Sequence, residues 1–283
     1  MMETIEWITY LIAVIFYILS SILYIYYIVF NKDDKIKYAF GSALVGLLSH
    51  SISITLRWIE TGQGPFVSTF EVFSQYAWVS VAIFLVMQKK YDEIKIAGFI
   101  IMPVSFLLMG MGSSYSKEFQ TSPPSLQTFW LMPHAVFASL AFGAILVATG
   151  MAILYILKEH FDNSKKDTHG PNLLYNKLPS LKAMDELMYR FVASGFISLS
   201  VMIISGAIWA YQSWGRYWAW DPIESWSLIA WLVYGIYLHQ RMNAGWKGTR
   251  VAWLLVVGIF ILVFTLFGAG YIYSGLHSSY MTP

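Results

Sequence analysis

Long apolar runs constrain the fold of this 283-residue chain more than any other feature of its sequence. Most of them reach the roughly 20 residues that a helix needs to cross a bilayer. Backbone groups inside hydrocarbon must be paired within their own segment, so such runs favour helices. We predict an all-α integral membrane protein with about eight transmembrane helices, forming a single polytopic domain over residues 1–283. The predicted spans are 7–30, 38–59, 67–88, 96–111, 130–157, 187–212, 222–240 and 251–273.

The fourth span, residues 96–111, is the shortest of the eight, and Pro103 interrupts it. Proline inside a helix removes a hydrogen bond and crowds the preceding turn. We therefore expect this span to be kinked or to be lengthened at its ends.

The composition agrees with a membrane protein and excludes several functions. Hydrophobic residues make up 57% of the chain and charged residues only 12%. The net charge of +2 gives no indication of nucleic-acid binding. Because cysteine is absent, thiol redox chemistry, iron–sulfur clusters and thiolate-ligated haem are excluded. Glu3 and Glu6 precede the first span and lysines follow it, the reverse of a cleaved signal peptide, so we expect a retained helix.

Basic residues indicate the orientation of the spans. In the eight-span topology, 15 of the 18 Lys and Arg residues lie in or beside loops on one side. Positively charged loops stay in the cytoplasm, so both termini are predicted to be extracytoplasmic. The longest basic loop, residues 158–186, is expected to be a polar cytoplasmic linker. Only Arg57, Lys117 and Arg216 fall on the external side.

A tryptophan-rich segment, WGRYWAWDPIESW over residues 214–226, lies between the sixth and seventh spans. It holds four of the twelve tryptophans, which include Trp214, Trp218 and Trp220. Single tryptophans gather at bilayer interfaces regardless of function, but this density predicts a platform for a flat apolar ligand with a polar edge. Asp221 also precedes Pro222 and stands three residues before Glu224, a capping-box pattern that predicts a helix start.

The histidines fall at distinct depths in this topology. His134 begins the fifth span and His277 follows the last span, so both share the external level of the tryptophan-rich segment. Together they could supply two imidazoles to one metal ion, as in a bis-histidine haem. His239 lies about 27 Å along the seventh helix from Asp221, at the inner leaflet. His50 lies near the middle of the membrane, where a buried hydrogen bond to Ser49, Ser53 or a neighbouring helix is an equally good interpretation.

The external side offers few cations for an anionic ligand edge such as the propionates of a porphyrin. Arg216 lies within the tryptophan-rich segment and is therefore our first candidate. Arg57 is the second.

The segment WGRYWAWDP resembles the "WWD" signature of haem-handling proteins of cytochrome c biogenesis, the superfamily of the CcsA/ResC, CcmC and CcmF types. The resemblance extends to HSISITLRWIETGQGPFVSTFEVFSQYAW, LMPHAVFA, IAWLVYGIYLHQR and the terminal GLHSSY. Eight spans and this length are most similar to the CcsA type, since CcmC types have six spans and CcmF types are larger. The family often has lysine directly after the Asp-Pro pair, where this chain has Ile223.

The resemblance implies a haem-binding site of defined composition. His134 and His277 would be axial ligands of haem b above the WWD segment, residues 214–226, which includes Trp214, Trp218, Trp220 and Asp221. His239 would ligate haem at an inner site, with its second ligand from a CcsB/ResB-like subunit or, within this chain, from His50. The implied location is a bacterial plasma membrane in contact with lipid, rather than a thylakoid membrane.

The implied activity is cytochrome c biogenesis. The chain would carry haem across the membrane and present ferrous haem for covalent attachment to an apocytochrome c with a CxxCH segment, as a membrane subunit of a cytochrome c synthase. It would supply position and protection rather than a covalent nucleophile. The alternatives are a haem exporter or chaperone that serves a separate attachment enzyme, a membrane-bound electron-transfer cytochrome, and a transporter with a histidine proton relay. The span interiors carry almost no ionisable residues beyond His50, which disfavours the transporter.

Overall fold

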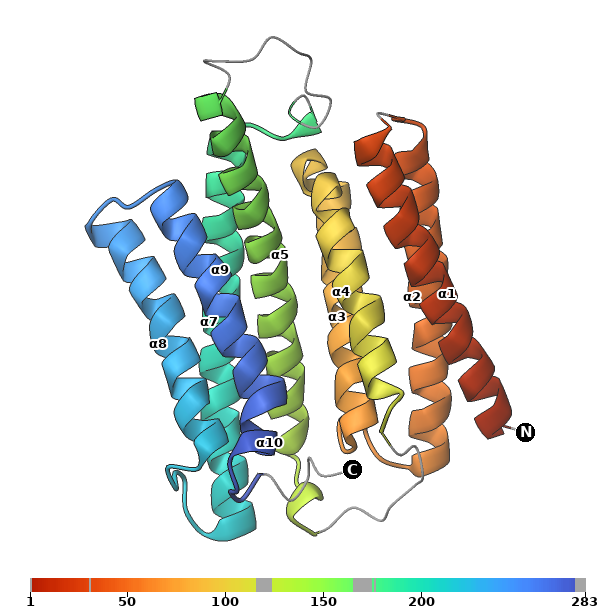
Figure 1. The fold of residues 1–283 in the computed structure, drawn as a ribbon. Helices are drawn as coiled ribbons and strands as arrows, with labels where there is room; N and C mark the ends of the chain where they lie inside the picture. The colour runs from red at the N-terminus through yellow and green to blue at the C-terminus, as the bar shows by residue number, and fades with distance from the viewer. Residues whose placement is uncertain (1, 31, 116–123, 165–174, 176, 278–283) are drawn as a thin grey trace.

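The fold is a bundle of long helices (Figure 1). The computed structural model describes residues 2–30, 32–115, 124–164, 175 and 177–277, and those residues include no β-strand. The elements are α1 (Met2–Val29), α2 (Lys35–Thr61), α3 (Thr69–Lys90), η1 (Asp92–Ala97), α4 (Gly98–Gly112), η2 (Pro124–Leu126), α5 (Leu131–Ser164), α7 (Leu181–Trp214), α8 (Pro222–Asn243), α9 (Thr249–Val263), η3 (Phe264–Gly268) and α10 (Ala269–Ile272).

The prediction of an all-α membrane protein is confirmed. Within the described part of the chain, seven helical segments are long and apolar enough to cross a membrane. The seventh predicted span, residues 222–240, is not among these seven and corresponds to α8, which has 22 residues but a more polar composition. At about 1.5 Å per residue its length still matches a bilayer core, and α8 lies beside α7 and α9.

Successive helices run up and down, so the loops divide between two ends of the bundle (Figure 1). One end, the lysine end, carries the connections α1–α2, α3–η1, α5–α7 and α8–α9. The opposite end carries Met2, the connections α2–α3 and α7–α8, and the close of the last span. We call it the WWD end, after residues 214–226. That this end faces outward is a prediction from the charge of the loops.

The fourth and fifth spans are longer than predicted. Residues 92–97 form the 3₁₀ segment η1, which lengthens the span ahead of α4, while Pro103 lies within α4. The linker predicted over residues 158–186 is helical at both ends, because α5 continues to Ser164 and α7 begins at Leu181. The side chain of Ser180 accepts from the backbone N–H of Ala183 at 3.2 Å and so caps α7. Residues 165–174 and 176, like Lys117, lie outside the described residues.

Helix α5 is the centre of the bundle. It packs against α3, α7 and α9, and most of its apolar core is buried. Small residues allow this close packing, as expected where lipid offers no hydrophobic drive for association. Gly195 of α7 is an example: a Cβ there would lie 2.7 Å from Cγ1 of Ile145 on α5.

The last span contains a π-helical turn, η3, that the sequence pattern did not predict. The Thr265 hydroxyl in this turn donates to the carbonyls of Ile261 at 2.8 Å and Trp226 at 3.2 Å, which ties the span to α8. Phe267 of the same turn stacks on Phe73 of α3, with ring centroids 4.5 Å apart. Such turns often occur at functional sites, and this one lines the pocket described next.

Candidate functional site

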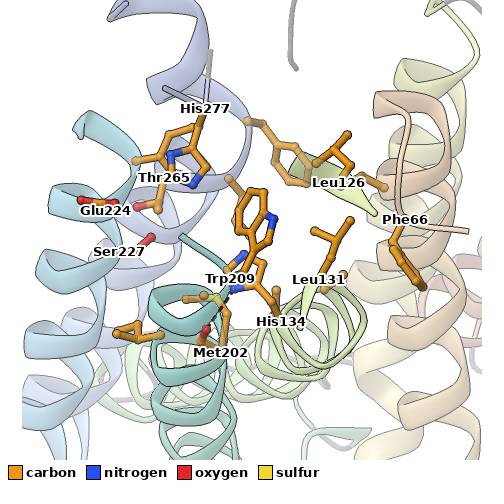
Figure 2. A pocket seen from close by; sticks show the side chains of 18 of the residues that line it. Phe66, Leu126, Leu131, His134, Met202, Trp209, Glu224, Ser227, Thr265 and His277 are labelled. Carbon is orange, nitrogen blue, oxygen red and sulfur yellow. Dashed lines mark hydrogen bonds between the residues drawn. The ribbon is translucent and has the colours of Figure 1, made fainter. Parts of the chain in front are cut away.

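A pocket of about 1350 Å³, its open mouth included, lies at the WWD end between α3, α5, α7, α8 and the π turn. Its walls are mostly apolar, with few polar side chains, as in typical ligand sites. His134, Trp218 and His277 line it, so the structure gathers three of the predicted site residues around one space. Figure 2 shows His134 and His277 on opposite sides of Trp209 in this pocket.

His134 stands in the first turn of α5 and faces α7. Its Nδ1 lies 2.9 Å from the carbonyl oxygen of Met202 (Figure 2). A carbonyl only accepts, so Nδ1–H is the donor and the lone pair of this imidazole is on Nε2. Gly206 makes the approach possible: a Cβ at that position would lie 2.7 Å from Nδ1 of His134.

His277 is held in a similar way, by a carboxylate. Its Nδ1 lies 3.0 Å from Oδ1 of Asp221, and its side chain is 15% exposed. Nδ1 is again the donor, which leaves Nε2 unprotonated. Histidines that ligate metals almost always donate their other ring nitrogen to a carbonyl or a carboxylate. Both imidazoles therefore have the hydrogen-bond arrangement that metal-ligating histidines commonly have.

The predicted capping box at the head of α8 is confirmed. Oδ1 of Asp221 accepts from the backbone N–H of Ile223 at 3.0 Å. In the reciprocal half of the capping box, Oε2 of Glu224 accepts from the backbone N–H groups of Asp221 at 3.1 Å and Ala219 at 2.8 Å. The local sequence thus fixes the loop between α7 and α8, and the loop fixes the carboxylate that holds His277.

The pKa of the Asp221 carboxyl is lowered. Burial by itself would raise this pKa, but the hydrogen bond from His277 and those from the backbone N–H groups of Ile223 and Leu276 outweigh burial and favour the carboxylate. Asp221 therefore remains ionised across the physiological pH range.

This shift predicts that the hydrogen bonds of the Asp221 carboxylate stabilise the ligand-free protein less in acid. The folded-state pKa lies below the unfolded value of about 3.9, so the stabilisation is present above that value and lost as the pH falls through the folded-state pKa. The difference in melting temperature between wild type and Asp221→Asn should be full at neutral pH and should shrink progressively as the pH falls below about 4. Scanning fluorimetry from about pH 7 down to about pH 2 checks the prediction, and a difference that does not shrink over this range contradicts it.

Aromatic side chains surround the two histidines. The ring of Trp209, 3% exposed, lies 5.6 Å from that of His134 and 5.4 Å from that of His277 between centroids. Trp214 lies 4.9 Å from His277 and 5.2 Å from Trp209. These rings form an apolar environment that would exclude water from a flat ligand bound by both imidazoles.

The remaining WWD tryptophans occupy different positions. Trp218 lines the pocket, and its buried Nε1 has no hydrogen-bond partner among the described residues. An unpaired buried donor costs free energy unless a ligand satisfies it, which fits an anionic or carbonyl-bearing ligand edge. Trp220 is 71% exposed and has a φ of 56°, the left-handed region that non-glycine residues rarely adopt.

The two candidate cations are in unlike surroundings. Arg216 is exposed on the α7–α8 loop, beside the pocket residues Tyr217 and Trp218. Arg57 is 8% exposed, and its Nε donates to Oε1 of Glu71 at 2.7 Å. Its Nη1 also lies 3.9 Å from Oε2 of Glu6. Arg57 thus links α1, α2 and α3 through buried charges and does not line the pocket.

His239 and His50 lie outside this pocket. His239 is exposed near the lysine end of α8, where its Nδ1 is 2.9 Å from Nδ2 of Asn243. His50 is fully buried between α1 and α3. Its Nε2 lies 2.7 Å from Oγ of Ser74, and its Nδ1 lies 3.4 Å from the hydroxyl oxygen of Tyr17. The hydrogen-bond interpretation of His50 is therefore confirmed, with Ser74 on a neighbouring helix as the partner.

Sequence analysis missed Trp209, Gly206 and the carbonyl of Met202. Trp209 lies within a predicted span, where interfacial tryptophans are common and carry no signal of their own. The pair Ser205-Gly206 is a small-residue signal of close approach to another helix, but the partner histidine is 72 positions earlier in the chain. Every residue has a backbone carbonyl, so the sequence does not show which carbonyl accepts a hydrogen bond from His134.

Comparison with known proteins identifies the family. The profile of the cytochrome C assembly protein family matches residues 7–277. Cytochrome c biogenesis protein CcsA of Guillardia theta is 30% identical over 98% of this chain and 94% of its own. The CcsA protein of Chlamydomonas reinhardtii is 35% identical over 80% of this chain and 63% of its own.

A solved structure, the cytochrome c haem lyase CcmF, has the same fold, with a TM-score of 0.72 at 15% identity. The match covers 99% of this chain and 49% of CcmF, so this chain spans about half of that protein. The family profile and the CcsA relatives together show that the chain belongs to the cytochrome c assembly family, as one of its CcsA-type members.

Proposed function

We propose that this chain receives haem and presents it at the WWD end for covalent attachment to an apocytochrome c. Family membership places it in cytochrome c biogenesis. The observation that carries the finer proposal is the matched pair of imidazoles: His134 and His277 both donate through Nδ1, and both leave Nε2 for a metal.

The pocket suits haem b in its remaining chemistry. Trp209 lines the pocket and would contact a porphyrin, Trp214 packs against Trp209 and His277, and the unpaired Nε1 of Trp218 suits a propionate oxygen. Arg216 on the adjoining loop is the proposed cation for a propionate. In the described residues, no group of three or more His, Cys, Asp or Glu side chains gathers to hold a bare metal ion.

The residues of this chain would hold and orient the haem, and exclude water from it, while two thiols of a CxxCH segment add to the haem vinyl groups as thioethers. The chain has no cysteine, so these thiols belong to the substrate. This addition requires ferrous haem, which two imidazoles and an apolar surround would shield from oxidation. Positioning is the proposed source of rate enhancement, which would make the chain a membrane subunit of a cytochrome c synthase.

Haem would first bind at the lysine end through His239. That histidine is exposed, and its Nδ1 lies 2.9 Å from Nδ2 of Asn243. A second ligand from a CcsB/ResB-like subunit fits this exposure. We place the complex in a bacterial plasma membrane, with its WWD end outward.

The test is to express the chain with a CcsB/ResB-type subunit and a CxxCH reporter in bacteria that lack their own assembly system. Wild type should purify with a bis-imidazole haem spectrum and should yield covalently haem-stained reporter. His134→Ala and His277→Ala should each lose both results, whereas His160→Ala, at an exposed histidine near the lysine end, should keep them.

The possible results separate the alternatives. If both site variants keep the spectrum and the cytochrome, the proposed ligands are wrong. If wild type binds haem but labels the reporter only when a separate attachment enzyme is added, the chain is an exporter. Stoichiometric haem that never leaves the protein indicates an electron-transfer cytochrome.

A further inference from the structure

Three donors converge on the carboxylate of Asp221. Its Oδ1 accepts from Ile223 N–H and from His277 Nδ1–H, each at 3.0 Å. Its Oδ2 accepts from the backbone N–H of Leu276 at 2.6 Å. The side chain is only 2% exposed, so these contacts are shielded from water and are stronger than surface contacts. One carboxylate therefore starts α8 and also fixes the segment 275–277, which we call the strap.

The backbone is shaped for this contact. A Cβ at Gly275 would lie 2.2 Å from Oδ2 of Asp221 and 2.9 Å from Cδ of Pro222. Only glycine allows the strap to lie directly against the head of α8. His277 consequently receives its position in the pocket from Asp221, although the two residues are 56 positions apart.

The two imidazoles of the site have different partners. The acceptor for His134 is a neutral backbone carbonyl, that of Met202, at 2.9 Å. The acceptor for His277 is an ionised carboxylate. Charge-assisted hydrogen bonds are roughly twice as strong as neutral ones, and such a partner makes an imidazole a more basic ligand.

We propose that Asp221 is a positioning residue that fixes the ring and the tautomer of His277 and makes it the more strongly donating of the two proposed ligands. This inference rests on the proposed function, because it assumes that His134 and His277 bind one iron. It also changes the role of Asp221, which acts through His277 and not by touching the haem. A negative charge behind one ligand favours oxidised iron, so this residue lowers the reduction potential of the bound haem.

Asp221→Asn removes the charge and keeps the helix cap, but its Nδ2 replaces one acceptor oxygen, so the hydrogen bond from Leu276 N–H to Oδ2 is also lost. Asparagine caps helices as well as aspartate does, and its Oδ1 still accepts a hydrogen bond. In the haem-free protein, ¹⁵N-histidine NMR should show His277 as the Nδ1–H tautomer in wild type, with a weaker Nδ1–H hydrogen bond in the variant. In the haem-loaded complex, the potential should shift positively and haem retention should fall by about 10–100-fold.

Two further variants complete the experiment. Asp221→Ser keeps a residue that can cap α8, but the serine side chain is too short to reach His277. This variant should therefore retain less haem than wild type, and it provides the test if Asp221→Asn misfolds. Asp92→Asn removes a carboxylate that is 85% exposed at the lysine end and should change neither potential nor retention.

The outcomes distinguish this inference from the proposed function. If wild type binds no haem, the proposed function fails, and the NMR comparison still decides whether Asp221 holds the Nδ1–H group of His277. If wild type binds haem but Asp221→Asn and Asp221→Ser retain it with the wild-type potential, the role of Asp221 is overturned.

Discussion

Replacing Gly206 with alanine is expected to weaken haem binding by about 10–100-fold while leaving the helix that carries it at least as stable. The added Cβ would meet Nδ1 and Cε1 of His134 at 2.7 and 2.9 Å. The ring can yield, because it is the end of a side chain on another helix, but it then leaves the carbonyl of Met202. Loss of such a partner typically costs 10–100-fold in metal affinity. Alanine meanwhile favours a helix over glycine by about 0.8–1.0 kcal/mol.

The measurement is haem per protein after purification, together with the melting temperature of the haem-free form. Gly41→Ala is the matched control, since nothing lies within 4 Å of a Cβ at that helical position. It should gain the same helix propensity and keep its haem. Full haem content in Gly206→Ala would show that the bond from His134 to Met202 does not matter for binding.

Removing Arg57 is expected to have the largest effect on stability. Arg57→Ala would remove the guanidinium that pairs with the buried carboxylate of Glu71 at 2.7 Å and lies 3.9 Å from that of Glu6. Breaking a buried ion pair by deleting one partner costs about 3–5 kcal/mol. Equilibrium unfolding in detergent should show this loss in the haem-free protein.

Arg216→Ala is the informative contrast. Arg216 is exposed, so its removal should change stability by less than about 0.5 kcal/mol, yet it should reduce haem retention if it binds a propionate. Lys95→Ala, which breaks an exposed pair with Asp92, should cost at most about 1 kcal/mol. If Arg57→Ala is as stable as Lys95→Ala, the buried cluster is not a structural element.

Much of the fold could be predicted, because a bilayer reduces the choice to apolar helices of fixed length. The common level of His134 and His277 followed from topology alone. The capping role of Asp221 followed from three residues at the right spacing. These features depend on local sequence or on counting spans, and both are visible without coordinates.

The rest depends on how helices rotate and approach each other. Arg57 had the depth and charge of a propionate partner, but the carboxylates that engage it come from α1 and α3. Whether His134 turns toward Met202 depends on the rotation of α5 against α7. The second role of Asp221, as partner of His277, needs the strap to fold back over 56 positions of sequence. No local pattern reports such contacts.

The π turn in the last span determines how the residues that follow it are rotated about the helix axis. A regular α-helix advances by about 100° per residue, so one additional residue rotates the downstream chain by that amount. Phe267 can therefore reach α3 while the strap still meets the head of α8. The number of residues between Thr265 and His277 is thus part of the site's geometry. A one-residue deletion there would misdirect the imidazole even though every side chain of the site remained.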